Sequence, residues 1–233
     1  MPEDMLLAWS GGKDSALALY VLQQRADVRV AALLTTVTEG YDRVTMHGVR
    51  RVLLERQAAA LGLPLHVVTI PQQASMESYG ARMEAALRAW QARGVHACAF
   101  GDLFLEDVRA YREASLAHIG MRAFFPLWGR DTRELAAWFL ALGFKAVVTC
   151  VDARRLDPAL AGREIGAAFL AQLPPHVDPC GENGEFHSFV YAGPILRQPV
   201  PCVRGEVVAR DTHFYFCDLL SVEPDRQARG WPA

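Results

Sequence analysis

The sequence of 233 residues predicts an α/β fold, in which a Rossmann-like, mostly parallel sheet is followed by a smaller carboxy-terminal α+β unit. Two observations lead to this expectation. Short apolar runs alternate with amphipathic helical patterns through the first two thirds of the chain, and such alternation requires crossover connections between parallel strands. After Pro174, Pro175 and Pro179 the apolar and polar residues instead alternate as they do in antiparallel strands.

The elements of the first part follow from this rhythm. Runs rich in β-formers predict strands over Leu6–Trp9, Val30–Val37, Leu65–Ile70, Val95–Phe100, Met121–Phe125 and Lys145–Val151. Helical spacing of apolar residues predicts helices that begin at Asp14 and that cover Gly48–Leu61, Met76–Arg93, Glu106–Ile119 and Thr132–Leu142. Gly62 and Gly94 follow two of these helices, at the position where glycine commonly ends a helix.

The last third is expected to form an antiparallel appendage packed beside the sheet. Its predicted elements are a helix near Gly162–Leu173 and strands over Phe186–Tyr191, Val200–Val208 and Thr212–Leu219. The chain contains no repeat and no low-complexity linker that would mark a sharp boundary. We therefore place the division near Trp128–Asp131, between a unit of residues 1–128 and a unit of residues 129–233.

The composition narrows the class of protein. Hydrophobic residues make up 52% of the chain, which is enough for a substantial core, and the net charge of -2 argues against an extensive nucleic-acid-binding surface. No apolar run reaches the length of a membrane span, so we expect no membrane contact and a cytoplasmic location. Five scattered cysteines without a C-x-x-C pair favour free thiols, and only two lysines, Lys13 and Lys145, stand among 22 arginines.

The segment Ser10–Ser15 (SGGKDS) lies between the first expected strand and the first expected helix. Its glycines let backbone N–H groups approach an anion, and the helix N-terminus adds donors and a positive dipole end. Lys13 supplies a cation, Ser10 and Ser15 supply hydroxyl groups, and Asp14 is a tentative Mg²⁺ ligand. We interpret Ser10, Gly11, Gly12, Lys13, Asp14 and Ser15 as a loop that holds the β and γ phosphates of ATP.

Other phosphate-binding motifs do not fit this segment. A Walker loop requires G-x-x-x-x-G-K-[ST], but Asp14 follows Lys13 and Leu7 occupies the position of the first glycine. A G-x-G-x-x-G motif is also absent there. The alternative without function is a strand–helix turn that contains glycine and a surface lysine.

A second polar segment, Asp178–Pro194 (DPCGENGEFHSFVYAGP), forms a glycine-rich turn before an expected strand. In that strand Glu185 and His187 should share one face, where they could exchange a proton or orient an amine. Glu182 lies in the adjoining turn. A solvated hairpin tip is the alternative, and a metal site formed by Glu185, His187 and Cys180 is a further one.

Both segments resemble a known family. The loop is typical of the adenine nucleotide α-hydrolase superfamily (HUP class, PP-loop ATP pyrophosphatases), whose five-stranded parallel sheet usually has the order 3-2-1-4-5. Residues 181–194 resemble the G-E-x-G-E-[YF]-H-[ST]-F-V…G-P signature of diphthine–ammonia ligase and its bacterial relatives, with Phe186 and Ser188 in place of the commoner Tyr and Thr. Shorter blocks also match, namely Met46–Gly48, Phe100–Leu103, Arg112 with Glu113, Pro126–Trp128 and Gly143–Ala146.

The resemblance assigns further site residues. The adenine of such enzymes lies against the end of the second strand, so Thr35 and Thr36 are expected to contact the nucleotide, as are His47 and Gly101. Asp102, after the fourth strand, is expected to bind Mg²⁺, to orient the acceptor or to cap a helix. His47 is equally compatible with a capping role.

The predicted activity is ATP-dependent amide formation. A substrate carboxylate attacks the α-phosphorus of ATP, pyrophosphate leaves, and ammonia then displaces AMP. The expected catalytic residues are Lys13, Asp14, Asp102, Glu182, Glu185 and His187, and the cofactors are ATP and Mg²⁺. The family's acceptor is diphthine on elongation factor two; in a bacterial source the acceptor would be another carboxylate.

Two rival functions remain open. The same loop serves enzymes that thiolate tRNA or modify nucleobases, although those commonly carry paired cysteines or a metal cluster. A sensor that binds ATP or AMP without turnover is the other rival. The oligomeric state cannot be read from the sequence.

Overall fold

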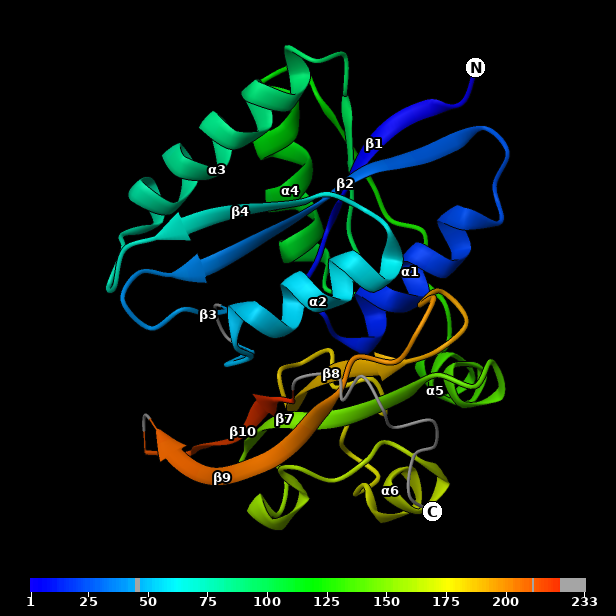
Figure 1. Cartoon of the computed structure of the whole chain (residues 1–233), viewed down its shortest axis with the longest axis vertical. Helices are drawn as coiled ribbons and strands as arrows, with labels where there is room; N and C mark the ends of the chain where they lie inside the picture. Colours follow the sequence, from blue (N-terminus) through cyan, green and yellow to red (C-terminus); the bar gives the residue numbers. More distant parts are fainter. Residues whose placement is uncertain (45–46, 211, 223–233) are drawn as a thin grey trace.

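The computed structural model describes residues 1–44, 47–210 and 212–222, and it arranges them as two β-sheets with helices between and around them (Figure 1). Among these residues no helix combines the length and the apolar character that crossing a membrane requires. The predicted fold class, a Rossmann-like α/β unit followed by a smaller α+β unit, is confirmed.

The first sheet contains β1 (Glu3–Ala8), β2 (Val28–Thr38), β3 (Arg43–Val44), β4 (Leu65–Ile70), β5 (Ala97–Ala99) and β6 (Arg122–Phe124). Its five longer strands pair in the order β4-β2-β1-β5-β6, and all of these pairings are parallel. Numbered as the predicted strands, this is the order 3-2-1-4-5. The two-residue strand β3, which the sequence analysis did not predict, pairs antiparallel with the end of β2.

Two helices cover each face of the first sheet (Figure 1). On one face lie α1 (Lys13–Gln23) and α2 (Arg51–Leu61), and on the other lie α3 (Met76–Gln91) and α4 (Glu106–His118). Because successive side chains of a strand point to opposite faces, Leu7 belongs to the core beneath α1 and α2 while Leu6 belongs to the core beneath α3 and α4. Gly62 ends α2 in the left-handed conformation, with φ of 70°.

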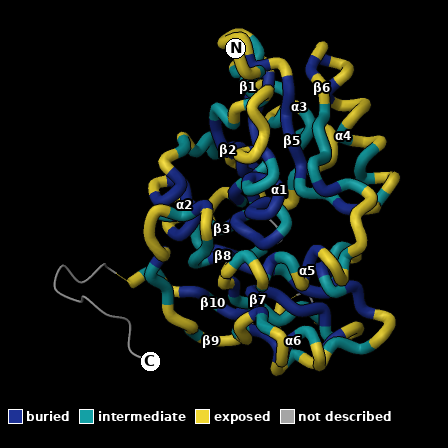
Figure 2. The backbone as a smooth tube through the Cα atoms, turned by 90° about the vertical axis from the view of Figure 1, so that its right-hand side faces the viewer, coloured by how far each residue is buried: buried dark blue, intermediate teal, exposed yellow. Residues whose placement is uncertain are grey.

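The second sheet is antiparallel, with the order β8-β7-β10-β9. Its strands are β7 (Lys145–Asp152), β8 (Phe186–Ala192), β9 (Cys202–Arg210) and β10 (Phe214–Ser221). The accompanying helices are α5 (Thr132–Ala141), the 3-10 turn η1 (Pro158–Leu160) and α6 (Ala167–Gln172). Most of β9 is exposed, as its position at the sheet edge requires (Figure 2).

Two expectations for this part are wrong in detail. The run Lys145–Val151 was expected to continue the parallel sheet, but β7 lies between β8 and β10 and pairs antiparallel with both. The helix expected over Gly162–Leu173 is shorter, because the N–H groups of Gly162 and Ile165 donate to carbonyl oxygens of β7, at 2.8 Å each. That segment therefore runs alongside the strand before α6 begins.

The two units meet at the Ser10–Ser15 loop. The backbone N–H of Val190 in β8 donates to the carbonyl of Gly11 at 2.9 Å. One continuous hydrophobic core includes Leu17 of α1, Leu54 of α2 and Phe189 of β8. The glycine-rich loop is therefore held between the parallel sheet and the antiparallel sheet.

Candidate active site

The loop has the conformation that an anion site needs. Gly11 has φ of 78°, and a Cβ atom there would approach Leu54 to 2.5 Å and the Gln57 side chain to 2.7 Å, so both the backbone angle and the available space require glycine. Gly12 is the N-cap of α1, and as a glycine it has no side chain that could bond the N–H groups of the first turn. The helix therefore presents its first turn to the space in front of the loop.

Hydroxyl groups brace the loop from within. Ser10 Oγ accepts from the N–H of Gly12 at 3.2 Å and lies 3.3 Å from Ser15 Oγ. Ser15 Oγ donates to the carbonyl of Gly12 at 2.9 Å. The N–H of Lys13 donates to Ser188 Oγ of β8 at 3.1 Å, so the second unit also contributes to the shape of the loop.

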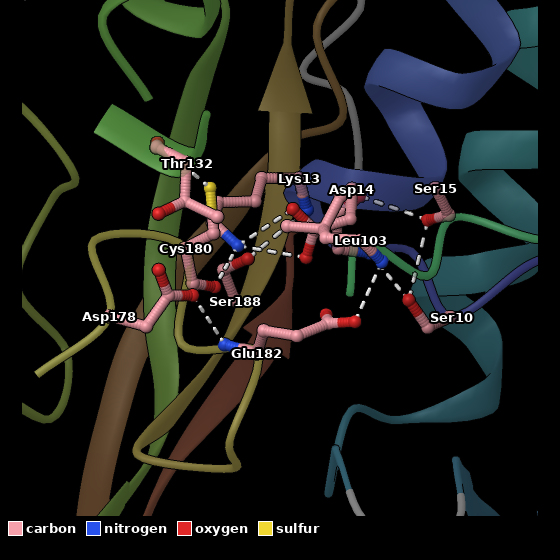
Figure 3. A network of polar contacts seen from close by, with 11 residues as sticks. Ser10, Lys13, Asp14, Ser15, Leu103, Thr132, Asp178, Cys180, Glu182 and Ser188 are labelled. Carbon is pink, nitrogen blue, oxygen red and sulfur yellow. Dashed lines mark hydrogen bonds and ion pairs between the residues drawn. The ribbon is translucent and has the colours of Figure 1, made fainter. Parts of the chain in front are cut away.

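Lys13 is the central cation of this site (Figure 3). Its side chain is only 3% exposed, and its Nζ donates to both carboxylate oxygens of Asp14, at 2.9 and 2.8 Å, and to the carbonyl of Cys180. Burial alone lowers the pKa of Lys13, but the negative charge of Asp14 and its neighbours outweighs burial, so the pKa is raised. Lys13 therefore remains charged at every physiological pH.

Glu182 faces the loop from the turn of the second unit. Its Oε1 accepts from the N–H of Leu103 at 2.7 Å, and its own N–H donates to Asp178 Oδ2 at 2.8 Å (Figure 3). Burial, reinforced by the carboxylates of Asp14 and Asp102, raises the pKa of Glu182 to about 7. A carboxyl group with this pKa can accept and release a proton near neutral pH.

These groups line one cavity of about 200 Å³ at the carboxyl ends of β1 and β5. Its lining includes most of the predicted site residues, namely Ser10, Gly12, Lys13, Asp14, Ser15, His47, Gly101, Asp102, Glu182 and His187. The segments 10–15, 101–102 and 180–188 are far apart in sequence, and parallel topology brings the first two to the same sheet edge. The cavity therefore combines a phosphate-type cradle with titratable groups.

Gly101 has a clear steric role there. A Cβ atom at this position would lie 2.9 Å from the carbonyl carbon of Asp14 and 3.0 Å from the N–H nitrogen of Ser15. Glycine therefore lets the end of β5 approach the first turn of α1.

The next residue, Asp102, is bound by Arg112, whose guanidinium donates to the two carboxylate oxygens at 2.5 and 3.1 Å.

The arrangement of Asp102 corrects the capping alternative. The N-cap of α4 is Leu105, without a side-chain hydrogen bond, so Asp102 does not cap that helix. Arg112 itself is only 30% exposed, and its guanidinium lies over the ring of Phe100 at 4.4 Å. Arg112 binds both oxygens of Asp102, as Lys13 binds both oxygens of Asp14, and besides burial the charge of Asp102 raises the pKa of Glu182 across the cavity.

The rings of His47 and His187 lie close together, with centroids 4.3 Å apart and planes tilted by 39°. Burial first, and then the neighbouring Lys13, lowers the pKa of His187 to about 4; burial and the charges of His187 and Lys13 also lower the pKa of His47. Both imidazoles are therefore neutral at pH 7 and can donate or accept one hydrogen bond at each nitrogen. Met46, the first residue of the resembling block around His47, lies outside the described residues.

Glu185 is not where the sequence analysis expected it. It precedes β8, is fully buried, and does not line the cavity with His187. Its Oε1 accepts from the N–H of Asp178 and from the side chain of Asn183, both at 3.1 Å, and Arg155 lies 3.7 Å away. The carboxylate therefore organises the turn that presents Glu182.

Thr35 and Thr36 likewise line neither this cavity nor the larger one beside it. Both lie within β2, paired with β4, and the hydroxyl of Thr35 is buried without a hydrogen-bond partner. Thr38, at the end of β2, lines the larger cavity. Their assignment to the adenine stays a prediction that the geometry of these cavities does not support.

Gln57 is a site residue that the sequence analysis missed. It is completely buried in α2, and its Nε2 donates to the carbonyls of Gly11 at 3.0 Å and of Val190 at 2.5 Å. Its Oε1 accepts from Trp9 Nε1 at 3.0 Å. A glutamine on the apolar face of a predicted helix was the available signal, because a buried amide needs specific partners.

The donor set allows a magnesium ion only together with phosphate oxygens. Within residues 1–44, 47–210 and 212–222 no group of three His, Cys, Asp or Glu residues is placed to hold a metal ion. Asp14 borders the cavity, and burial raises its pKa, an effect that a nearby cation would oppose. Asp14 thus fits as the protein ligand of a Mg²⁺ ion that is also bound by a nucleotide.

Comparison with known proteins identifies the family of this chain. Residues 4–123 match the family profile of the diphthamide synthase N-terminal domain, and residues 131–218 match that of the diphthamide synthase C-terminal domain. The chain belongs to the diphthamide synthase family. Both the loop of the first unit and the Glu182 turn of the second lie within these matches, so the cavity forms where the two family domains meet.

Comparisons with curated proteins and with solved structures say less about this chain than the family profiles do. None of the curated proteins compared matches this chain. Among solved structures, the chain resembles the U34-tRNA thiolase NcsA from Methanococcus maripaludis with its 4Fe-4S cluster, at 17% identity and a TM-score of 0.39. That likeness covers 60% of this chain and 58% of the thiolase chain. The family match indicates an enzyme of the PP-loop ATP pyrophosphatase type.

Proposed function

We propose that this protein is an ATP-dependent amide-forming ligase, which adenylates a carboxylate with release of pyrophosphate and then transfers the acyl group to ammonia. The observation that carries the proposal is the single cavity in which Lys13, at the N-terminus of α1, faces Glu182 from the second unit. The acceptor proposed from the family is diphthine on elongation factor two, or a related carboxylate.

In the first step an oxygen of the acceptor carboxylate forms a bond to the α-phosphorus of ATP. The bond from the α-phosphorus to the oxygen that bridges to the β-phosphorus breaks, and pyrophosphate leaves. The N-terminus of α1 and the charged Lys13 would stabilise the negative charge that develops on this leaving group. Mg²⁺, held by Asp14 and the phosphates, would neutralise part of the same charge.

In the second step ammonia attacks the acyl carbon and AMP leaves. Ammonium must first lose a proton, and attack generates a further one, so a base is required near the acyl group. Glu182, with a pKa of about 7, is the group in the cavity that fits this role. His187 is neutral at pH 7 and is proposed to orient the reacting groups by hydrogen bonding.

The cysteines offer little support for the thiolation alternative. Burial raises the pKa of Cys98, Cys150 and Cys180 to about 12, and that of Cys202 to about 11. Thiolates are the reactive form of cysteine, and they are scarce at neutral pH when the pKa is this high. A nucleotide sensor without turnover would have no use for a proton acceptor such as Glu182.

The test is ammonium-dependent formation of AMP and pyrophosphate from ATP, with elongation factor two that carries diphthine as acceptor. Lys13→Met, which keeps the apolar stem, and Lys13→Ala should each lower the rate at least 100-fold, because the departing pyrophosphate loses its cation. Lys145→Ala is the matched control, since Lys145 is exposed on β7 and should leave the rate unchanged.

Three outcomes would contradict the proposal. The first is undiminished AMP formation in both Lys13 variants. The second is cleavage of ATP to ADP and phosphate. The third is nucleotide binding without any AMP, tested over a panel of carboxylates, which would favour the sensor.

A further inference from the structure

A second, larger cavity of about 580 Å³ lies where the end of β2 and β3 meet the β9–β10 hairpin. It is lined by Thr38, Tyr41, Arg43, Val44, Gly48, His187, Gly205, Glu206, Val208, Arg210, Phe214, Phe216, Asp218 and Leu220. His187 is part of the lining of both cavities. A molecule in the larger cavity can therefore contact the same neutral imidazole that borders the phosphate cavity.

The walls of this cavity are mainly apolar and aromatic. Phe214 and Phe216 present rings with centroids 6.3 Å apart, and Tyr41, Val44, Val208 and Leu220 add further apolar surface. The charged residues of the lining are Arg43, Glu206, Arg210 and Asp218. Of these, Asp218 already accepts from Arg43 at 2.8 Å and from Arg50 at 2.6 and 3.0 Å. The cavity thus suits an organic body with apolar or ring surfaces better than a phosphate chain.

The opening of the cavity is exposed. At its rim Tyr41 is 55% exposed, Val208 40% and Leu220 38%, and β9 forms the outer edge of its sheet. An arm that projects from a larger molecule could therefore enter without burial of the rest of that molecule. Eight of the fourteen lining residues come from the β9–β10 region, the part of the chain furthest from the phosphate-binding loop in sequence.

We propose that this cavity is the acceptor site, which binds the carboxylate-bearing acceptor as an arm with an apolar or aromatic body and directs its carboxylate past His187 toward the α-phosphorus of ATP. The inference rests on the proposed ligase function. In the step it serves, the carboxylate oxygen bonds to the α-phosphorus as pyrophosphate departs, and no proton is transferred.

The rival occupant is the nucleoside of ATP itself. The strands of the second sheet supply most of the walls of the larger cavity but only Phe186, His187 and Ser188 of the phosphate cavity. The two cavities therefore have largely different walls, which favours a second molecule, the acceptor, as the occupant of the larger one. The residues expected to contact adenine, Thr35 and Thr36, do not line the larger cavity either.

The experiment compares Val208→Trp with Val207→Trp in the full chain. The two valines are neighbours on β9, 40% and 38% exposed, but only Val208 lines the cavity. Because successive strand residues point to opposite faces, only the tryptophan at position 208 should fill the cavity. Circular dichroism and thermal unfolding verify that both variants fold.

Three quantities are measured for each variant and the wild type. They are the affinity for α,β-methylene ATP, the direct binding of elongation factor two that carries diphthine, and the KM for that acceptor in AMP formation. For Val208→Trp we expect nucleotide affinity within twofold of the wild type, and acceptor binding and KM each weakened at least tenfold. Val207→Trp should change none of the three.

The outcomes separate this inference from the ligase proposal. Loss of nucleotide affinity in Val208→Trp would place the nucleoside in the cavity and overturn the inference, as would unchanged acceptor binding. If the wild type binds the acceptor but makes no AMP, and Val208→Trp still weakens that binding, the ligase proposal fails and the acceptor site stands.

Discussion

Glu182 and Glu185 lie three residues apart in one turn, yet their carboxylates have different surroundings. Glu182 reaches the cavity and bonds to Leu103 across the unit boundary, while Glu185 is enclosed by the N–H of Asp178, Asn183 and Arg155. At the scale of single residues we therefore assign the proton transfer to Glu182, which faces the Ser10–Ser15 loop, and a structural role in the turn to Glu185. The two roles can be separated by isosteric substitution.

We predict that Glu182→Gln lowers the rate of AMP formation about 100-fold or more, since an amide cannot accept the ammonium proton. Glu185→Gln should stay within about tenfold of the wild type, because an amide oxygen can still accept from Asp178 and Asn183. Steady-state kinetics on both variants, with nucleotide affinity as the control, test the assignment. A larger loss of rate in Glu185→Gln than in Glu182→Gln would instead identify Glu185 as the general base.

The pH dependence follows from the same carboxyl group. A general base acts when it is deprotonated, so with a pKa of about 7 the wild-type rate should rise as the pH increases through about 7. The raised pKa also means that ionised Glu182 is disfavoured in the folded state, so its contribution to stability is present below the usual pKa of 4.5 and is lost as the pH rises through about 7. Glu182→Gln should therefore melt at a higher temperature than the wild type at pH 8, and the difference should vanish near pH 4. A flat rate profile between pH 6 and 8 would count against this base.

At the scale of elements, the site depends on how closely α1, α2 and β8 pack around the loop. Gln57 of α2 binds the carbonyls of Gly11 and Val190, and so joins the first helix pair to the second sheet. Gly101 permits the end of β5 to lie close to α1, because a Cβ atom at this position would come within 2.9–3.0 Å of the backbone of Asp14 and Ser15. The position of Lys13 is thus determined by contacts between elements as much as by its own bonds.

Gln57→Leu should destabilise the fold by about 1–3 kcal/mol, because the buried Trp9 N–H loses its acceptor and the carbonyls of Gly11 and Val190 each lose one donor, although the Val190 N–H still donates to Gly11. Gln57→Glu, in contrast, retains an acceptor for Trp9 and loses the two donated bonds. Urea denaturation measures the loss, and the KM for ATP should rise in Gln57→Leu while the exposed Gln23→Leu remains unchanged in both measurements. A change below about 0.5 kcal/mol would show that the loop is held by other contacts.

At the scale of the whole molecule, the two units are also joined by a charged cluster. Asp218 of β10 accepts from Arg43 of β3 and from Arg50 just before α2, and Arg43 also donates to the carbonyl of Gly48 at 2.8 Å. A Cβ atom on Gly48 would lie 2.6 Å from the ring of Phe216. The cluster therefore fixes the segment that carries His47 against the second sheet.

Asp218→Asn should lower the free energy of unfolding at pH 7 by about 1–2 kcal/mol, a moderate value because the Arg50 side chain is 41% exposed. Hydrogen bonds from Arg50 and Arg43 hold the pKa of Asp218 well below its usual value of 3.8. A lowered pKa gives stability that is present above 3.8 and lost as the pH falls below it, so the two proteins should converge in acid. Denaturation curves at pH 7 and pH 3 measure this; a constant difference would contradict the ionic origin.

The sequence by itself indicated the alternation of strands and helices, the candidate phosphate-binding loop and the family, whose resemblance also implied the strand order, since hydrophobic periodicity, glycine spacing and a dense local motif are all properties of short segments. Only the tertiary structure decided which carboxylate faces the loop, that β7 joins the antiparallel sheet, and that Gln57 and Ser188 shape the cradle. Those outcomes depend on contacts between residues from about 35 to 175 positions apart, or on which way one turn is folded. The periodicity of a single segment carries no information about either.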